Sequence, residues 1–176
     1  MRIYAISGHA QNGKDTVASE MYQILTQRGE RVLQIHYADL LKFICSSCFG
    51  WDGKKDERGR HILQYVGTDV VRKKAPDYWV NFVCELLTIF DKEWDTVLIP
   101  DARFPNEIDR LKEQFHYVRH LRVIRPGFDN KLSAEQKKHP SETALDHVYP
   151  DRVFVNAGTL EDLKEQVAHY IEEKHH

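Results

Sequence analysis

The chain reads Gly8-His9-Ala10-Gln11-Asn12-Gly13-Lys14 near its amino end, and this run fits the pattern G-x-x-x-x-G-K. An apolar run, Ile3-Tyr4-Ala5-Ile6, precedes it and predicts a buried strand. Residues 15–28 follow it, and their apolar side chains recur at helical spacing. A strand, a glycine-containing loop and a helix in this order indicate a phosphate-binding loop. The alternative is a glycine turn that carries a solvated lysine.

Each part of this motif has a physical use in holding a triphosphate. The glycines let backbone N–H groups curl around the β-phosphate, and the following helix adds the partial positive charge of its N-terminus. Lys14 then reaches the β- and γ-phosphate oxygens. We therefore expect ATP to bind at a continuous segment made of Gly8, His9, Ala10, Gln11, Asn12, Gly13, Lys14, Asp15 and Thr16.

One position departs from the usual motif. Ser or Thr normally follows the lysine, and its hydroxyl meets Mg²⁺, but here Asp15 holds that place and Thr16 comes one residue later. We interpret Asp15 as a ligand of Mg²⁺, directly or through water, with Thr16 at the α-phosphate. The alternative role of Asp15 is to cap the helix N-terminus.

A second acidic residue follows a later apolar run. Thr96-Val97-Leu98-Ile99-Pro100 predicts a buried strand, and Asp101 comes directly after it. Ligands collect at the carboxyl ends of strands in open α/β sheets, so Asp101 is the candidate for a second acid beside Mg²⁺. Arg103 is expected to face the same crevice. The alternative for Asp101 is a surface turn.

Length and composition are those of one folded domain. The chain has 176 residues, of which 41% are hydrophobic and 30% charged, so we expect a single domain over residues 1–176. The net charge of -2 gives no general attraction to nucleic acids or acidic membranes. No signal-peptide layout and no apolar run of membrane-spanning length is visible, which predicts a cytoplasmic protein.

Three cysteines, Cys45, Cys48 and Cys84, are too few for a disulfide framework and fit a reducing compartment. Cys45 and Cys48 form a C-x-x-C pair in an apolar stretch without a second pair nearby. We therefore expect buried thiols on one helix face rather than redox or metal chemistry. The closing His175-His176 is either a native tail or a tag remnant, and we give it no role.

Beyond the motif, short β-branched runs alternate with longer helical stretches, which is typical of an α/β fold. The polar segment at residues 128–150 lacks periodicity and predicts a mobile lid. Between the second and third strands, the helices form an inserted helical layer, which Pro76 interrupts. The further strands are predicted at residues 31–37, 96–100, 118–125 and 152–156, and the further helices at residues 40–48, 58–74, 78–90 and 160–173.

Further short motifs occur in order along most of the chain. They are Ser7-Gly8, Gly13-Lys14-Asp15-Thr16, Tyr37-Ala38-Asp39, Leu41-Lys42, Leu63-Gln64-Tyr65-Val66-Gly67-Thr68-Asp69, Arg72, Asp77-Tyr78-Trp79-Val80, Ile99-Pro100-Asp101-Ala102-Arg103, Val123-Ile124-Arg125-Pro126-Gly127, His139-Pro140-Ser141-Glu142 and Asn156-Ala157-Gly158-Thr159-Leu160. In number and order they resemble the phage-type deoxynucleoside monophosphate kinases, a branch of the P-loop nucleoside and nucleotide kinases. That family also has Asp after the P-loop lysine.

The resemblance implies a three-layer P-loop NTPase fold with a five-stranded parallel sheet of order 2-3-1-4-5. It implies ATP with Mg²⁺ as the donor and a (deoxy)nucleoside monophosphate as the acceptor, bound by a helical region at about residues 38–92 and covered by a lid at about residues 126–150. Arg72 and Arg103 would contact the acceptor phosphate, and Trp79 would pack near the base. The implied acceptor-binding residues are Asp39, Lys42, Arg72, Trp79 and Arg103.

The mechanism expected from these parts is in-line phosphoryl transfer without a protein nucleophile. Its catalytic candidates are Lys14, Asp101, Arg103 and Arg125, and its metal ligands are Asp15 and Asp101. Plainer roles stay open for three acceptor residues. Arg72 can be a solvated helix residue, Trp79 a core residue and Asp39 a helix cap.

Two other readings of the function remain. The chain could be a P-loop kinase of another small phosphorylated acceptor, of the phosphomevalonate or dephospho-coenzyme A type. It could also be a nucleotide-binding switch that hydrolyses slowly and signals through its lid. Small nucleotides are the expected partners, a homodimer is compatible with the sequence, and the sequence names neither the base nor the sugar of the acceptor.

Overall fold

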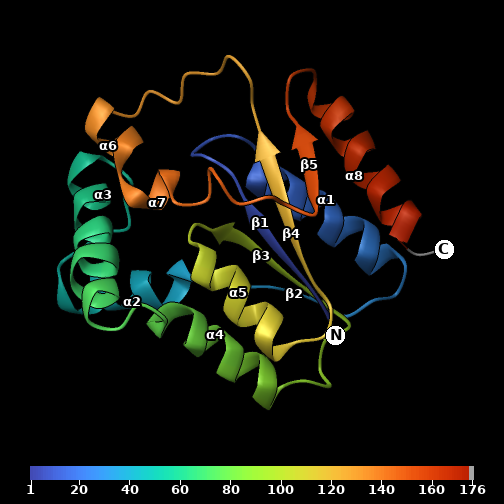
Figure 1. The fold of residues 1–176 in the computed structure, drawn as a ribbon, viewed down its shortest axis with the longest axis horizontal. Helices are drawn as coiled ribbons and strands as arrows, with labels where there is room; N and C mark the ends of the chain where they lie inside the picture. The colour runs from blue at the N-terminus through green and yellow to red at the C-terminus, as the bar shows by residue number, and fades with distance from the viewer. Residues whose placement is uncertain (175–176) are drawn as a thin grey trace.

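Residues 1–174 are described by a computed structural model, and they form a five-stranded sheet of order β2-β3-β1-β4-β5 between layers of helices (Figure 1). Each pair of neighbouring strands is parallel. The predicted α/β fold and the sheet order are confirmed. His175 and His176 lie outside the described residues. The strands are β1 (Arg2–Ser7), β2 (Val32–Gln34), β3 (Thr96–Ala102), β4 (Val118–Ile124) and β5 (Arg152–Val155).

The central strand β1 contributes side chains to two separate cores. Ile3 and Ala5 belong to the core under α4 (Tyr78–Ile89) and α5 (Pro105–Gln114), whereas Tyr4 and Ile6 belong to the core under α1 (Lys14–Gln27) and α8 (Leu160–Lys174). Successive residues of a strand point to opposite faces, and helices cover both faces of this sheet (Figure 1). A parallel strand covered on both sides has a continuous apolar run, as β1 has at residues 3–6.

The inserted helical layer contains α2 (Ala38–Cys48), α3 (Glu57–Gln64) and the π-helix η1 (Tyr65–Arg72). The single helix predicted at residues 58–74 is therefore an α-helix that widens into a π-helix. Gly67 lies in this π-helix, and a Cβ there would stand 2.7 Å from Leu41 Cδ2. The missing side chain lets η1 pack closely on α2. π-Helical segments occur frequently at functional sites.

Three helices of the structure are absent from the sequence prediction. Helix α5 begins with Pro105 at its first position, and the Glu107 side chain accepts the N–H of the N-cap residue Phe104 at 3.0 Å, which are usual signals of a helix start. Its ten residues are too few for a clear periodic pattern. The segment predicted as the lid contains the short helices α6 (Ala134–Lys138) and α7 (Pro140–Thr143).

The cysteines of the C-x-x-C pair differ in burial. Cys45 is buried and Cys48 is exposed, so the expectation that both are buried is wrong. Cys45 packs with Trp51 and Val66, whereas Cys48 is the last residue of α2 and extends past this cluster. Cys84 is buried, and all three thiols are free. No helix within residues 1–174 has both the length and the apolarity needed to cross a bilayer.

Candidate active site

The predicted phosphate-binding loop connects the end of β1 to the start of α1. Gly8 and Gly13 have φ angles of 145° and 105°, a region that L side chains rarely adopt. A Cβ on Gly8 would lie 2.3 Å from the main-chain oxygen of Val123, and a Cβ on Gly13 would lie 2.9 Å from Asn156 Nδ2. Both glycines are therefore required by the backbone conformation and by close packing.

Two asparagines fasten this loop to the neighbouring strands. Asn12 Nδ2 donates to the main-chain oxygen of Val123 in β4 at 3.2 Å. Asn156 Nδ2 donates to the main-chain oxygen of Asn12 at 3.0 Å. Asn156 is not among the predicted site residues. Its place directly after β5, at the carboxyl edge of the sheet, is the signal that could have identified it.

Lys14 is the first residue of α1, and its ammonium group turns back over the loop. Lys14 Nζ donates to the main-chain oxygens of Gly8 at 2.6 Å and His9 at 2.9 Å. Burial, followed by the charge on Arg103, lowers the pKa of Lys14 to about 8, and the charge on Glu142 opposes this change. A phosphate group would supply the negative charge that a buried ammonium lacks.

A carboxylate from the lid lies at the mouth of the loop. Glu142 Oε2 accepts a hydrogen bond from the Ala10 N–H at 3.0 Å, and Glu142 Oε1 forms an ion pair with Arg103 Nη1. Burial raises the pKa of Glu142, but Arg103, the Ala10 N–H and Lys14 outweigh burial and lower this pKa below its usual value. A loop amide and cationic side chains therefore converge on one anionic group.

Further side-chain contacts hold the P-loop, one of them between buried strand residues and one from the lid. Ser7 Oγ lies 2.7 Å from His120 Nε2, and both residues are buried. Burial, followed by the charge on Arg122, lowers the pKa of His120 to about 4, so this imidazole is neutral at pH 7. On the lid side, His9 Nε2 lies 2.9 Å from Asp146 Oδ1, which also accepts from Arg122 Nη2 at 2.9 Å.

The two predicted metal ligands have different surroundings. Asp15 lies in the first turn of α1 and is exposed beside Lys14. Both oxygens of Asp101 already accept main-chain N–H groups at the start of α2, from Tyr37 at 2.9 Å and Ala38 at 3.0 Å. Residues 1–174 contain no group of three His, Cys, Asp or Glu side chains that could hold a metal. Carboxylate oxygens with substrate phosphates and waters are nevertheless the usual ligands of Mg²⁺, so the donor set fits this ion.

On the acceptor side, a buried ion pair joins η1 to α5. Arg72 Nη2 pairs with Glu107 Oε1, and the Arg72 guanidinium stacks over the Phe104 ring at 3.8 Å from its centroid. The other Glu107 oxygen accepts the main-chain N–H of Arg103 at 2.6 Å. Arg103 Nη1 also donates to the main-chain oxygen of Ser141 at 2.9 Å. Arg103 therefore connects the acceptor side with the lid and the P-loop.

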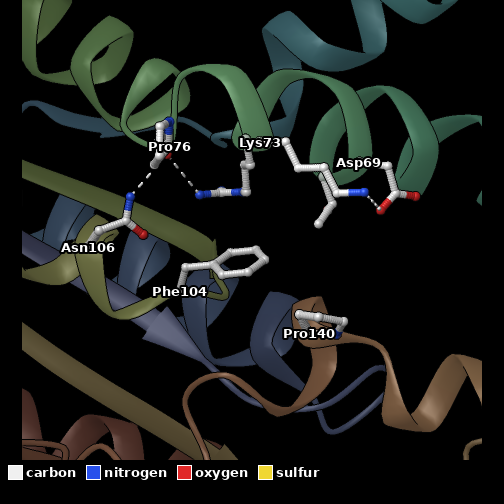
Figure 2. Close-up of a pocket in the computed structure, with 8 residues that line it drawn as sticks. Asp69, Lys73, Pro76, Phe104, Asn106 and Pro140 are labelled. Atoms are coloured by element: carbon white, nitrogen blue, oxygen red, sulfur yellow. Dashed lines mark hydrogen bonds and ion pairs between the residues drawn. The ribbon is translucent and has the colours of Figure 1, made fainter.

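A cavity of about 360 Å³ opens beside this ion pair (Figure 2). Phe104 forms one wall, Asp69 of η1 and Lys73, which follows η1, form the opposite wall, and Pro140 approaches from the lid. Asn106 donates to the main-chain oxygen of Pro76 at 3.1 Å and thereby ties α5 to the loop before α4. The lining residues are Thr68, Asp69, Arg72, Lys73, Pro76, Phe104, Asn106 and Pro140.

Of the five predicted acceptor residues, Arg72 lines this cavity, and the other four, Asp39, Lys42, Trp79 and Arg103, are not among the lining residues. Trp79 is buried, with 3% of its surface exposed, and its indole N–H donates to the main-chain oxygen of Gly67 at 3.1 Å. Asp39 accepts from the His36 N–H at 3.0 Å and from Lys42 Nζ at 3.0 Å, at the start of α2. The structure thus places Trp79 in the core beside η1, and Asp39 and Lys42 in the first turns of α2, outside the cavity lining.

Arg125 follows β4 on the nucleotide side of the sheet. Its guanidinium is exposed and stacks over the Phe128 ring at 3.9 Å from the centroid. Arg125 Nη1 also donates to the main-chain oxygen of Gln11 at 3.5 Å. Arg125 thus lies where the P-loop and the lid segment begin to face each other.

Comparison with known proteins agrees with this fold. Residues 51–167 match the model of the family described as deoxynucleotide monophosphate kinase, and the P-loop lies before the matched segment. No curated protein sequence matches the chain significantly.

Solved structures of several kinases share the fold. The Mycobacterium tuberculosis APS kinase in complex with AMPPNP and APS has a TM-score of 0.57 at 12% identity, covering 97% of each chain. A sugar kinase from Janibacter sp. has a TM-score of 0.58 at 16% identity, covering 98% of this chain and 95% of that chain. Dephospho-CoA kinase from Campylobacter jejuni has a TM-score of 0.57 at 14% identity, covering 98% and 96%.

The family match covers well over half of the chain, and the shared fold extends over nearly all of it. Identities this low show the fold alone, so the family assignment depends on the family match. This protein is a P-loop kinase that belongs to the deoxynucleotide monophosphate kinase family.

Proposed function

We propose that the protein transfers the γ-phosphoryl group of ATP to the phosphate of a deoxynucleoside monophosphate. The observation that carries this proposal is the position of Arg103. Its guanidinium pairs with Glu142 at the P-loop, and its main-chain N–H is held by Glu107 at the acceptor cavity. Arg103 thus lies between Glu142, which binds the P-loop, and Glu107, which pairs with the cavity residue Arg72.

On the nucleotide side, the loop N–H groups and Lys14 hold the phosphate tail of ATP. Lys14 and Arg103 neutralise the charge that develops on the moving phosphoryl group. Asp15 holds Mg²⁺, directly or through water. Asp101, near the end of β3, is the second acid beside the metal. When bound, Mg²⁺ neutralises the charge of the phosphate tail. Arg125 faces the nucleotide from the lid side.

On the acceptor side, Arg72 and Arg103 bind the acceptor phosphate, because guanidinium groups can donate two parallel hydrogen bonds to a phosphate dianion. The cavity beside Phe104 takes the nucleoside part. Asp39 and Lys42 act on the acceptor from the start of α2, and Trp79 acts indirectly through its hydrogen bond to Gly67 of η1. An acceptor phosphate is already an anionic nucleophile, so no protein base is required.

The wider setting follows from the charge and the thiols. The net charge of -2 supports small nucleotides as partners, with neither nucleic acid nor membrane among them. Three free cysteines support a cytoplasmic location. ATP and Mg²⁺ are the donor and the metal.

The test is ADP release with each common deoxynucleoside and ribonucleoside monophosphate, with phosphomevalonate and dephospho-coenzyme A as further acceptors. Turnover with at least one deoxynucleoside monophosphate, far above the rate without acceptor, supports the proposal. The Lys14→Ala variant provides the blank. Equal ADP release with and without every acceptor would instead favour a nucleotide-hydrolysing switch. Turnover with phosphomevalonate or dephospho-coenzyme A alone would assign the cavity to that acceptor.

A further inference from the structure

Glu107 is a buried carboxylate with partners in several segments of the acceptor side. It is 1% exposed. Its Oε1 pairs with Arg72 from η1, and its Oε2 accepts the N–H groups of Arg103 at 2.6 Å and Phe104 at 3.0 Å. The Tyr37 hydroxyl donates to the main-chain oxygen of Glu107 at 3.1 Å. One side chain therefore touches both arginines of the acceptor site.

This arrangement restricts both arginines. The Arg72 guanidinium is held between the Glu107 carboxylate and the Phe104 ring, and only 13% of its side chain is exposed. A charge this buried keeps its place because leaving its partner is costly. The bond to the Arg103 N–H fixes the main chain from which the second guanidinium extends. One carboxylate thus holds both the guanidinium of Arg72 and the main chain of Arg103.

We propose that Glu107 is a positioning residue of the acceptor site, which aligns Arg72 and Arg103 for an acceptor phosphate dianion. The inference rests on the proposed acceptor role of these arginines. Cations fixed before binding lose little conformational entropy when phosphate arrives. Glu107 itself does not touch the phosphate, because its two oxygens are already engaged.

A purely structural role of Glu107 can be separated from the positioning role. Glu107 also caps the N-terminus of α5 by accepting the N–H groups of Arg103 and Phe104. The amide oxygen of glutamine can keep this cap, but the neutral amide loses the ion pair with Arg72. Glu107→Gln therefore tests positioning while preserving the helix start. Glu113→Gln, at an exposed position of the same helix, is the matched control.

The experiment measures KM for ATP and for the best deoxynucleoside monophosphate of the panel. Glu107→Gln should raise the acceptor KM about tenfold and change the ATP KM less than about twofold. Added to Arg72→Ala, the same substitution should change the acceptor KM less than about twofold, because Glu107 acts through Arg72. Glu113→Gln should leave both KM values unchanged.

Other outcomes overturn one proposal or the other. Equal rises in both KM values, or additive effects in the double variant, would reduce Glu107 to a structural role. An unchanged acceptor KM in both Arg72→Ala and Arg103→Ala would instead refute the proposed acceptor site. If thermal unfolding shows that Glu107→Gln does not fold, Glu107→Asp, which keeps the charge and shortens its reach, supplies the same comparison.

A second, independent observation concerns Glu142 on the nucleotide side. Its carboxylate binds the Ala10 N–H and Arg103 and lies close enough to Lys14 to affect that group's pKa. These are the groups assigned to the phosphate tail of ATP. Meanwhile, Lys14 Nζ donates to carbonyl oxygens of its own loop. We infer that Glu142 lies at a position that a phosphate group of ATP would take in the P-loop, and that it must leave before ATP binds.

Calorimetry without an acceptor tests this inference, using AMPPNP and pyrophosphate, each with Mg²⁺. Glu142→Gln keeps the shape but removes the charge that repels phosphate, so both ligands should bind about five- to tenfold more tightly. Glu135→Gln, at an exposed position of α6, should not change the affinity. Unchanged or weaker binding in both Glu142→Gln and Glu142→Ala would overturn the inference. Failure of the wild-type chain and both variants to bind AMPPNP would refute the proposed ATP site itself.

Discussion

The nucleotide side and the acceptor side of this site are held by different physical means. The P-loop keeps its shape through main-chain geometry, because Gly8 and Gly13 have positive φ angles and pack where no Cβ fits. The acceptor side keeps its shape through side-chain charges, because Arg72 of η1 is paired with Glu107 of α5. The first region is continuous in sequence, and the second is assembled from separate helices.

This difference predicts different responses to substitution. The backbone sets the geometry of the P-loop. Conservative substitutions of its non-glycine side chains should therefore change the rate of phosphoryl transfer without changing the conformation of the loop. A site built on a buried ion pair responds to loss of a single charge, because the remaining partner stays buried without compensation. The acceptor side is therefore the region where binding specificity is most open to change by one substitution.

The largest effect is expected at Lys14, on the nucleotide side. Lys14→Ala removes the ammonium that contacts the phosphate tail and should lower kcat by a factor on the order of 10²–10³ or more. Circular dichroism should show an unchanged fold, because Lys14 bonds only to Gly8 and His9 carbonyls of its own loop. A variant with wild-type kcat would end the proposal that this loop handles ATP.

Arg103 tests whether the two regions share one residue. Arg103→Ala should raise the acceptor KM by a factor on the order of 10–10², because a phosphate contact is lost, and raise the ATP KM less. Steady-state kinetics with each substrate varied in turn provides both values. A larger rise in the ATP KM than in the acceptor KM would assign Arg103 to the nucleotide side instead.

A pH profile separates the nucleotide side from the acceptor side without mutation. The free enzyme has a Lys14 pKa lowered to about 8, so the ammonium loses its proton above that pH. The kcat/KM for ATP should fall about fivefold between pH 8 and pH 9, since it reports the free enzyme. At saturating ATP, kcat should fall at higher pH, because bound phosphates raise this pKa. A kcat/KM for ATP that stays constant up to pH 9.5 would contradict the lowered pKa of Lys14.

The smallest effect is expected at the cavity wall. Phe104→Leu removes the ring under the Arg72 guanidinium but keeps an apolar side chain, so the acceptor KM should rise about two- to fivefold. The ATP KM should stay within error. The control is Phe128→Leu, which removes the ring under Arg125 on the nucleotide side. A rise in acceptor KM for the control alone would reverse the assignment of the two regions.

The parts of the site that the sequence predicted are those with local determinants. The P-loop needs a strand, two glycines and a helix start, and all of these are adjacent in the chain. The acceptor wall was not predictable in the same way. Phe104 and Glu107 gain their roles only by meeting η1, and η1 in turn packs closely on α2 at Gly67. Trp79 shows the converse, since an aromatic residue expected near the base lies in the core.

From its residues alone, the chain could be assigned an α/β sheet, a phosphate loop and a set of cations and carboxylates for phosphoryl transfer. Hydrophobic periodicity and glycine placement are local properties, so they are readable without a structure. The pairing of Glu107 with Arg72, and of Glu142 with the P-loop, became visible only after folding. Such contacts join residues more than thirty positions apart, and charge pairing over that range depends on how the helices and the lid segment pack.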